Sequence, residues 1–390
     1  MAKKVLGVKL EIFLLGIVSL LTDISSEMIF SVFSVFFTVV LGASAALLGL
    51  VEGLADFAAS SLDYVSGFFS DKTGKRKRFA ILGYGSSTVA KGILIFANSI
   101  GVASVFRIVE RFGKSIRGPP RDAWISSLAD KSRRGYAFGL HKTLDKSGAI
   151  IGPLLAYAFF TVFAQTMDSF KLLFLLALVP AVASTLLLFF LKDKPSRPKR
   201  RENIFKAYKK LDKRFRRYLI AAAFFSIAYF SFGFLLLKAY VTGFSLADVI
   251  LLYALFNVSF VAVSAPIGWL GDKIGRSKII ASSYVLYALM AVGFIFATTK
   301  TEIIALFVLY GIFFAIDEGQ TKAYVSDLER SKRGTAIGFY NFMTGLVYLP
   351  ASVIAGLLWL VNPSYAFTFA ALIALGALVI FLGLKKASNK

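Results

Sequence analysis

Long apolar segments, separated by short polar connections, follow one another along nearly the whole chain of 390 residues. Segments of about 20 apolar residues with few charges are typical of helices that cross a bilayer. The composition agrees, because 57% of the residues are hydrophobic and only 17% are charged, whereas soluble domains carry about 25% charged residues. The sequence therefore predicts an all-α integral membrane protein. We expect twelve transmembrane helices, at residues 11–41, 45–70, 79–98, 101–120, 135–163, 170–191, 218–242, 245–271, 278–298, 302–326, 334–361 and 364–384.

The connections between these segments alternate in charge. One set is short and nearly uncharged, as in "LGASAA" and "ANSIG", and the other set is basic, as in "SDKTGKRKR" and "ADKSRRG". Lys and Arg accumulate on the cytoplasmic side of membrane proteins. The pattern predicts a multi-pass protein of the cell membrane with both termini in the cytoplasm.

Two stretches of the sequence are repeated in the second half of the chain. "GFFSDKTGKRKR" at Gly67 returns as "GWLGDKIGRSK" at Gly268, and "AWISSLADKSRRGYAFG" returns as "AYVSDLERSKRGTAIG" about 200 residues later. Matched loops at half the chain length indicate a parallel repeat about an axis along the membrane normal. We therefore expect two pseudo-symmetric six-helix bundles, residues 1–191 and 218–390.

The linker between these halves, residues 192–217, holds 13 basic residues against three acidic ones. Its later part, "ENIFKAYKKLDKRFRRYL", has apolar residues at helical spacing, namely Ile204, Tyr208, Leu211 and Phe215. This pattern favours an amphipathic helix lying against the anionic lipids of the inner leaflet. A solvated tether between the halves is the alternative, and the two interpretations are compatible.

The repeated loop resembles the signature of the major facilitator superfamily, Gly-x-x-x-Asp-Lys/Arg-x-Gly-Lys/Arg between spans two and three and again between spans eight and nine. "LTDISSEM", "RGPPRDA" and "GLHKTLDKSGAIIGP" further resemble a subgroup of exporters in that family. The resemblance covers the whole chain, and it implies a gating role for this motif, as a latch between the halves on the cytoplasmic side. The motif residues are Gly67, Asp71, Lys72, Gly74, Lys75 and Arg76, and in the second copy Gly268, Asp272, Gly275 and Arg276.

Each residue type in this motif has a physical reason. Gly67 and Gly268 lack a side chain, so that a neighbouring helix can approach closely. The two Asp residues are placed to face a helix N-terminus or a cytoplasmic Arg. Gly74 and Gly275 can supply a tight turn. A purely topological basic loop is the alternative, although it would not need this Gly and Asp spacing.

Charged residues also occur inside the expected spans, where they are costly and usually mark a functional site. The carboxylates Glu52, Asp56 and Asp63 fall within a sector of about 40° on one helix. Span four carries a basic stripe, made by Arg107, Arg111 and Lys114. Ion pairs within the bundle would explain both stripes. For the deeper residues, Glu52, Asp56, Arg107 and Arg111, we favour a functional role.

Span one offers Asp23 and Glu27, one helical turn apart. The family resemblance implies that spans one, four, seven and ten line a central cavity. A carboxylate shielded from water can bind and release a proton near neutral pH, so these two are the first candidates for substrate contact or proton coupling. The alternative is a structural ion pair with Arg107 or Arg111. Lys91 and Lys238 are interpreted as snorkelling residues, although Lys238 could face the cavity.

Span five contains Gly148, Gly152 and Pro153, which resemble the antiporter signature of proton-coupled drug exporters; Ala156 and Tyr157 replace its final glycines. The only histidine, His141, stands one turn before Asp145. This pair could relay a proton, but near the cytoplasmic end a structural hydrogen bond is the favoured interpretation.

These features predict a secondary active transporter that moves a small solute by alternating access, as proton-coupled export through antiport. Proton- or ion-coupled symport, and facilitated diffusion of a metabolite, siderophore or metal complex, are the alternatives. With one His and no Cys, and without the motifs of hydrolases or nucleotide-binding proteins, we expect no enzyme, no cofactor and no metal site. The expected partners are a small-molecule substrate, protons and membrane lipids. The net charge of +23 lies in short runs without interleaved aromatic residues, so we expect no nucleic acid partner, and a monomer.

Overall fold

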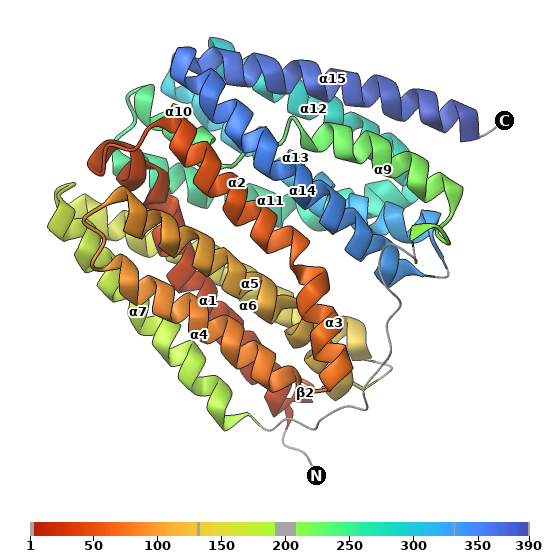
Figure 1. Ribbon diagram of the computed structural model, residues 1–390, viewed down its shortest axis with the longest axis horizontal. Coiled ribbons are helices and arrows are strands. Elements are labelled where there is room, and N and C mark those ends of the chain that lie inside the picture. Colours follow the sequence, from red (N-terminus) through yellow and green to blue (C-terminus); the bar gives the residue numbers. More distant parts are fainter. Residues whose placement is uncertain (1–3, 131–132, 192–207, 331, 389–390) are drawn as a thin grey trace. The chain divides into compact units, whose positions relative to one another are not determined.

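The protein is described here by a computed structural model, which covers residues 4–130, 133–191, 208–330 and 332–388 and is built almost entirely of helices (Figure 1). The elements are β1 (Lys4–Val5), β2 (Val8–Lys9), α1 (Leu10–Val35), the π-helix η1 (Phe36–Val40), α2 (Ala45–Ser61), α3 (Asp63–Thr73), α4 (Arg76–Leu94), α5 (Ile100–Leu128), α6 (Arg134–Val162), α7 (Met167–Phe190), α9 (Lys213–Ser226), α10 (Gly233–Val241), α11 (Leu246–Ile274), α12 (Arg276–Phe296), α13 (Lys300–Leu328), α14 (Arg333–Val361) and α15 (Pro363–Ser388).

Every apolar segment predicted as a span coincides with helical structure, so the all-α prediction is confirmed. Seven described stretches are long and apolar enough to cross a membrane by length and composition alone: Leu10–Val40, Ala45–Thr73, Met167–Phe190, Leu246–Ile274, Arg276–Phe296, Arg333–Val361 and Pro363–Lys385. The remaining long helices, α4, α5, α6 and α13, carry charged residues within their apolar segments.

Three spans are not the continuous α-helices that were expected. Span one ends in the π-helix η1, span two is broken at Leu62, and span seven is interrupted between Ser226 and Gly233. A short antiparallel hairpin of β1 and β2 precedes span one. Its turn residues, Leu6 and Gly7, both have positive φ angles, as two-residue hairpin turns of this kind require.

The helices group into two compact units by their contacts. Unit 1 comprises Met1–Gly42, Leu62–Arg201 and Leu246–Ala254, and unit 2 comprises Ala43–Ser61, Glu202–Ser245 and Leu255–Lys390. These units describe packing, whereas the two halves expected at 1–191 and 218–390 describe the sequence repeat, so that division stays a prediction.

In unit 1, α1 packs against α6 and α7, and α4 packs against α5 and α7. A buried apolar cluster joins these helices around Leu15, Tyr84, Trp124 and Leu188. The tight contact between α4 and α5 depends on glycines, because a Cβ on Gly83 would lie 2.6 Å from both the Arg117 Cβ and the Gly113 carbonyl oxygen. This contact holds the middle of α5 in place.

In unit 2, α2 runs along α14. Glycines from both helices form the seam, since a Cβ on Gly53 would lie 2.9 Å from the Leu349 carbonyl oxygen and one on Gly356 would lie 2.7 Å from that of Ala45. The rest of unit 2 has an aromatic core, in which Phe225 stacks on Tyr284 with ring centroids 4.2 Å apart.

The predicted amphipathic helix in the linker falls partly on residues 192–207, which lie outside the described residues. From Tyr208 onward the chain turns, and α9 begins at Lys213 with Asp212 as its cap, whose Oδ1 accepts a 2.7 Å hydrogen bond from the Arg214 N–H. Leu211 and Phe215 are buried in the protein. Because they are covered by protein, these two side chains are not the lipid-facing stripe that was expected.

Candidate functional site

A charged cavity lies in unit 1, against α1 and α5. The free space inside it is about 40 Å³, which is room for a few water molecules. Its polar lining combines carboxylates and cations that were singled out in the sequence with others that were not. The lining residues are Asp23, Ser26, Glu27, Ile29, Phe30, Phe33, Phe106, Arg107, Glu110, Arg111, Lys114, Arg117 and Tyr253.

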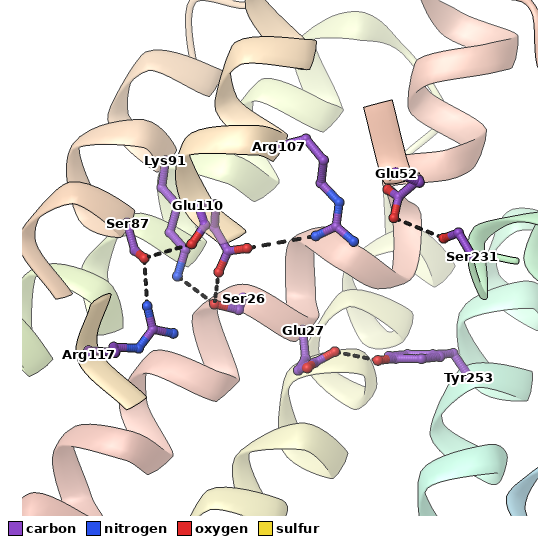
Figure 2. Close-up of polar contacts among 10 residues, drawn as sticks. All are labelled: Ser26, Glu27, Glu52, Ser87, Lys91, Arg107, Glu110, Arg117, Ser231 and Tyr253. Atoms are coloured by element: carbon purple, nitrogen blue, oxygen red, sulfur yellow. Dashed lines mark hydrogen bonds and ion pairs between the residues drawn. The ribbon is translucent and has the colours of Figure 1, made fainter. Parts of the chain in front are cut away.

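Glu110 is at the centre of a hydrogen-bonded network in this site (Figure 2). Its Oε1 accepts a 3.1 Å hydrogen bond from Ser26 Oγ, which in turn accepts a 2.9 Å bond from Lys91 Nζ. Arg107 Nη1 lies 3.8 Å from Glu110 Oε2. Both side chains of this ion pair are nearly inaccessible to solvent, so each charge needs the other.

The interpretation of Lys91 as a snorkelling residue is wrong. Its side chain is fully buried, and its ammonium group donates to Ser26. A lysine in this position brings a positive charge beneath the cavity instead of extending to the membrane surface. Lys238, the other lysine interpreted as snorkelling, is partly buried on α10.

Arg117, which lines the cavity, is held by residues of α4. Its Nη1 donates a 2.6 Å hydrogen bond to Ser87 Oγ, which itself donates to the Glu110 carbonyl oxygen at 3.2 Å (Figure 2). The guanidinium also lies 4.7 Å from the centre of the Tyr84 ring. These contacts fix the orientation of the charge, which is what a binding site requires.

Arg107 and Arg111 lie over one aromatic ring, that of Phe30. The distances from the guanidinium carbon atoms to the ring centre are 4.5 Å and 5.5 Å. Such cation–π contacts stabilise a guanidinium that is out of water. The same ring contacts Tyr253 edge-on, with centroids 5.4 Å apart.

Glu27 accepts a 2.5 Å hydrogen bond from the hydroxyl group of Tyr253 (Figure 2). Tyr253 comes from the first residues of α11, which belong to unit 1. Glu27 therefore has a neutral donor as one partner, and the structural ion pair considered for it in the sequence is not needed to satisfy this oxygen.

The antiporter-like glycines of α6 pack directly behind the two carboxylates of α1. A Cβ on Gly148 would lie 2.5 Å from the Leu20 carbonyl oxygen and 3.0 Å from the Asp23 Cβ. One on Gly152 would lie 3.1 Å from the Glu27 Cβ. The glycines let α1 and α6 approach closely at this level, and Pro153 follows inside the helix.

His141 and Asp145 do not form the structural hydrogen bond that was favoured. Asp145 instead accepts a 2.5 Å bond from Ser19 Oγ and lies 3.9 Å from Arg121 Nη1. His141 is buried, and within the described residues its Nε2 has no hydrogen-bond partner. A charged guanidinium is a stronger partner for a carboxylate than a neutral imidazole.

Glu52 and Asp56 lie on α2, in unit 2. Glu52 is fully buried, and its Oε2 accepts a 2.9 Å hydrogen bond from Ser231 Oγ (Figure 2). Ser231 belongs to the non-helical stretch between α9 and α10, where interrupted helices of transporters commonly offer polar groups to a solute. Asp56 is half-buried one turn further along α2.

The gating motif ends its helix at a glycine with positive φ in both copies, although Gly74 has ψ near 6° and Gly275 has ψ near 126°. Gly74 and Gly275 have φ angles of 68° and 96°, and their N–H groups close the preceding helices by donating to the Ser70 and Gly271 carbonyl oxygens. Gly67 is buried, as a close helix contact requires. Gly268 differs, because a Cβ there would meet nothing within 4 Å, and the close approach occurs instead at Gly271, against Gln320.

The Asp residue of the second copy binds an Arg, which is one of the two partners considered for it from the sequence, the other being a helix N-terminus. Asp272 Oδ1 accepts a 2.5 Å bond from Arg276 Nη2, and Arg276 Nη1 lies 3.3 Å from Asp327. In the first copy Arg76 is buried, and its Nε and Nη1 have no hydrogen-bond partner within the described residues. In the repeat Lys75 corresponds to Arg276 and Ser127 to Asp327, so that the first copy has a hydroxyl group where the second has a carboxylate.

Within the described residues, no group of three or more His, Asp or Glu side chains is arranged to hold a metal ion. The site residues that sequence reasoning missed are Ser26, Ser87, Arg117, Ser231 and Tyr253. A lysine inside an apolar span was the available signal for Lys91, but nothing local to Tyr253 or Ser231 distinguishes them from other polar residues of a membrane helix.

Comparison with known proteins places this geometry in a family. The family model for the Major Facilitator Superfamily matches residues 15–263 and 218–390. An uncharacterized MFS-type transporter of Methanocaldococcus jannaschii is 37% identical over 381 residues, covering 95% of this chain and 94% of that protein.

More distant matches agree. The multidrug resistance protein MdtH of Photorhabdus laumondii is 26% identical over 137 residues, or 35% of this chain and 34% of that protein. The crystal structure of the nucleoside transporter NupG has the same fold, with a TM-score of 0.76 at 13% identity over 98% of this chain and 100% of that one. The chain therefore belongs to the major facilitator superfamily, with the all-α membrane fold of about twelve spans that the family shares.

Proposed function

We propose that this member of the family is a proton-coupled transporter of a small solute, and that Asp23 and Glu27 bind the coupling proton. Transport by alternating access follows from the family. The observation that carries the proton assignment is the position of both carboxylates at the charged cavity, with Glu27 held by Tyr253 and Asp23 close to Lys114 and Asp145. Carboxylates at membrane depth are costly and are kept where they move protons or bind solutes.

Export by antiport is the first direction proposed. Two observations support it: Gly148 and Gly152 pack against α1 at the level of the two carboxylates, and part of the chain is similar to a multidrug resistance protein. Closely packed helices at a proton site couple protonation to a helix shift, because a packed contact has few alternative arrangements.

Symport is the second candidate, and a different observation favours it. The cavity lining has four cations and three carboxylates, so that removing one negative charge by protonation leaves a site that attracts anions. A solute bound in that way would move together with the proton.

For the repeated loop we propose a latch on the cytoplasmic side, with both termini in the cytoplasm and the basic linker near the anionic lipids of the cell membrane. The support is the helix ends with positive φ at Gly74 and Gly275 and the ion pairs of Arg276. Asp71→Asn is expected to lower the rate of transport while substrate affinity stays unchanged. Equal transport rates for the variant and the wild-type protein would contradict the proposed latch role of this loop.

Purified protein in liposomes tests the proton assignment, with a substrate found first by a thermal-shift screen. For Glu27→Gln, and for Asp23→Asn, we expect loss of transport driven by a pH gradient and retention of exchange between equal substrate pools. Glu318→Gln is the matched control, because Glu318 is a carboxylate of α13 that lies 3.8 Å from Lys322; it should retain both activities. Gradient-driven transport that survives both substitutions in α1 would place the proton site elsewhere, with Glu52 and Asp56 next.

A further inference from the structure

A second cavity lies in unit 2, between the ends of three helices. The free space inside it is about 170 Å³, and an engineered cavity of about 150 Å³ is large enough to hold a benzene molecule. It is bounded by α9, α13 and α15, of which α9 packs against the other two (Figure 1). This unit 2 cavity therefore has room for a group of several heavy atoms. Its lining residues are Arg214, Arg217, Tyr218, Ala221, Tyr324, Leu328, Phe381, Leu384 and Lys385.

The unit 2 cavity lies at the boundary between apolar and charged sequence. The apolar part of α9 begins directly after Arg217, and the stretch of α15 that could cross a membrane ends at Lys385. The third helix, α13, ends at Leu328, and the basic sequence "ERSKRG" follows it. Basic residues gather at the cytoplasmic ends of membrane helices. The cavity is thus where three helices reach the level of the lipid headgroups.

The rim of this cavity is positively charged. Arg214, Arg217 and Lys385 line it, and no carboxylate among the described residues does. Asp212 accepts from Nε and Nη2 of Arg214, which leaves the Nη1 donors of the guanidinium for a ligand. Lys385 Nζ donates a 2.9 Å bond to the neutral Ser277 hydroxyl group, which uses one of its three donors. Arg214 and Lys385 therefore both keep donors that an anion could occupy.

The buried part of the lining is aromatic. Tyr218 and Phe381 are buried, and their ring centroids are 5.9 Å apart. Tyr324 meets Tyr218 edge-on at 5.0 Å and lies 6.3 Å from Phe381. Three rings that pack on one another form a wall suited to hydrocarbon. A ligand in this cavity would therefore combine an anionic group with apolar parts.

On two of the helices, an exposed apolar residue lies one turn deeper than a cation of the rim. Ile220 follows Arg217 by three residues on α9, and Leu382 precedes Lys385 by three on α15, so each pair shares a helix face. Ile220 is 58% exposed and Leu382 is 43% exposed. Since α9 runs into its apolar segment and α15 runs out of its own, both apolar residues lie on the bilayer side of their cations. The surface therefore continues from the charged rim along an apolar path.

We propose that the unit 2 cavity binds an anionic phospholipid of the inner leaflet, with the phosphate group against Arg214 and Lys385. Its acyl chains then lie along Ile220 and Leu382. Basic side chains bind phosphate oxygens by charge-assisted hydrogen bonds, which a free phosphate could also satisfy, but only a lipid covers the apolar path as well. The proposal goes beyond the proposed transport function. It uses only the proposed topology, in which this end of the helices is cytoplasmic.

Lipid binding to the purified full-length protein tests the proposal. The protein in a non-ionic detergent is titrated with phosphatidylglycerol, or with phosphatidylcholine of the same acyl chains, and native mass spectrometry counts the bound copies. We expect phosphatidylglycerol to bind about tenfold more tightly, as one charge-assisted hydrogen bond would provide. Inorganic phosphate, added as a competitor, should be at least about a hundredfold weaker, because it buries no hydrocarbon.

Lys385→Gln and Arg214→Gln should each reduce the affinity for phosphatidylglycerol about tenfold. Lys213→Gln is the matched control, because it removes the same charge from the exposed first residue of α9, outside the cavity; it should change the affinity by less than about twofold. A diffuse attraction would instead be worth about 1 kcal/mol for every basic residue near the surface, and would make the three variants equal.

A steric variant tests the cavity without changing its charge. Leu328→Trp fills part of the free space and should reduce phosphatidylglycerol binding about tenfold, as the loss of one good contact would. Thermal unfolding of the variant shows whether it is folded, and if it is not, the smaller Leu328→Phe takes its place.

Two results would overturn the proposal. An equal loss of affinity in Lys213→Gln and Lys385→Gln would assign the binding to diffuse attraction, and inorganic phosphate that competes as well as the lipid would assign the cavity to a free anion. Because binding is measured in detergent and without a pH gradient, neither result depends on the proton assignment or on the topology. A failure of this proposal is therefore distinguishable from a failure of the proposed function.

Discussion

The Tyr253 hydroxyl group donates to Glu27 across 226 positions of sequence, with an O–O distance of 2.5 Å. Glu27 is on α1 and Tyr253 is in the first residues of α11, so a helix from the second half of the sequence completes the charged site of the first. The contact gives Glu27 a neutral donor, which supports a carboxylate without adding a charge.

Removing this hydroxyl group should destabilise the protein measurably. Tyr253→Phe keeps the ring that contacts Phe30 and removes one hydrogen bond to an ionisable group, which is worth about 1.5–3 kcal/mol. The free energy of unfolding in detergent is the measurement. Tyr365→Phe, on an exposed tyrosine of α15, should change it by less than about 0.5 kcal/mol. Equal effects of the two substitutions would mean that the bond to Glu27 contributes nothing.

The glycine seam between α2 and α14 predicts a sharp contrast between two Gly→Ala substitutions. An added Cβ at Gly49 would collide with the Ser352 carbonyl oxygen, while one at Gly92 on α4 would meet nothing within 4 Å. Gly49→Ala should lower the free energy of unfolding by about 1–3 kcal/mol through overpacking. Gly92→Ala should raise it by up to about 1 kcal/mol, because alanine favours the helix. Thermal or denaturant unfolding measures whether each substitution lowers or raises the free energy of unfolding.

The unequal copies of the gating motif predict a stabilising substitution. Ser127→Asp places a carboxylate where the second half has Asp327, which lies 3.3 Å from Arg276. It should pair with Lys75, which stands where the second half has Arg276, and raise the free energy of unfolding by up to about 1 kcal/mol. The neighbouring Ser126→Asp should not. In the Lys75→Gln background the gain should vanish, and a gain that persists there would assign it to another partner.

The absence of cysteine from the sequence allows a direct test of the proposed topology. Ser44 lies before α2, in an uncharged connection, and Lys209 lies in the turn before α9. In sealed right-side-out vesicles, an impermeant thiol reagent should modify Ser44→Cys and leave Lys209→Cys unmodified until the vesicles are opened. Modification of Lys209→Cys in sealed vesicles would contradict the proposed orientation and place this segment outside.

Much of the fold could be predicted because each membrane helix is determined by the residues of its own segment. A stretch of apolar residues must satisfy its backbone hydrogen bonds within itself, so each span follows from its own sequence. The turns at Gly74 and Gly275 are equally local, since each needs only a residue that tolerates positive φ. The breaks at Leu62 and between Ser226 and Gly233 have no such local signal, and in the second break Ser231 binds the Glu52 carboxylate of α2.

The site was only partly predictable for the same reason. The carboxylates and arginines stood out because charges are rare in apolar spans, but their partners depend on which helices pack together. Ser231 and Tyr253 come from segments more than 170 residues from Glu52 and Glu27. Lys91 was interpreted wrongly because snorkelling depends on which way the helix faces, and Ser26 and Glu110 on neighbouring helices gave its charge a place inside.

The interruption of span seven determines how movement travels along it. α9 is fixed at its start, where the Asp212 N–H donates to Glu329 at 2.9 Å, and at its end the Tyr287 hydroxyl group holds the Ala228 carbonyl oxygen at 2.8 Å. A continuous helix behaves as a rod, and a push at one end displaces the other. Two short rods joined by the six residues from Ile227 to Phe232 do not transmit that push. A tilt of α10 is therefore absorbed at these six residues and does not reach α9.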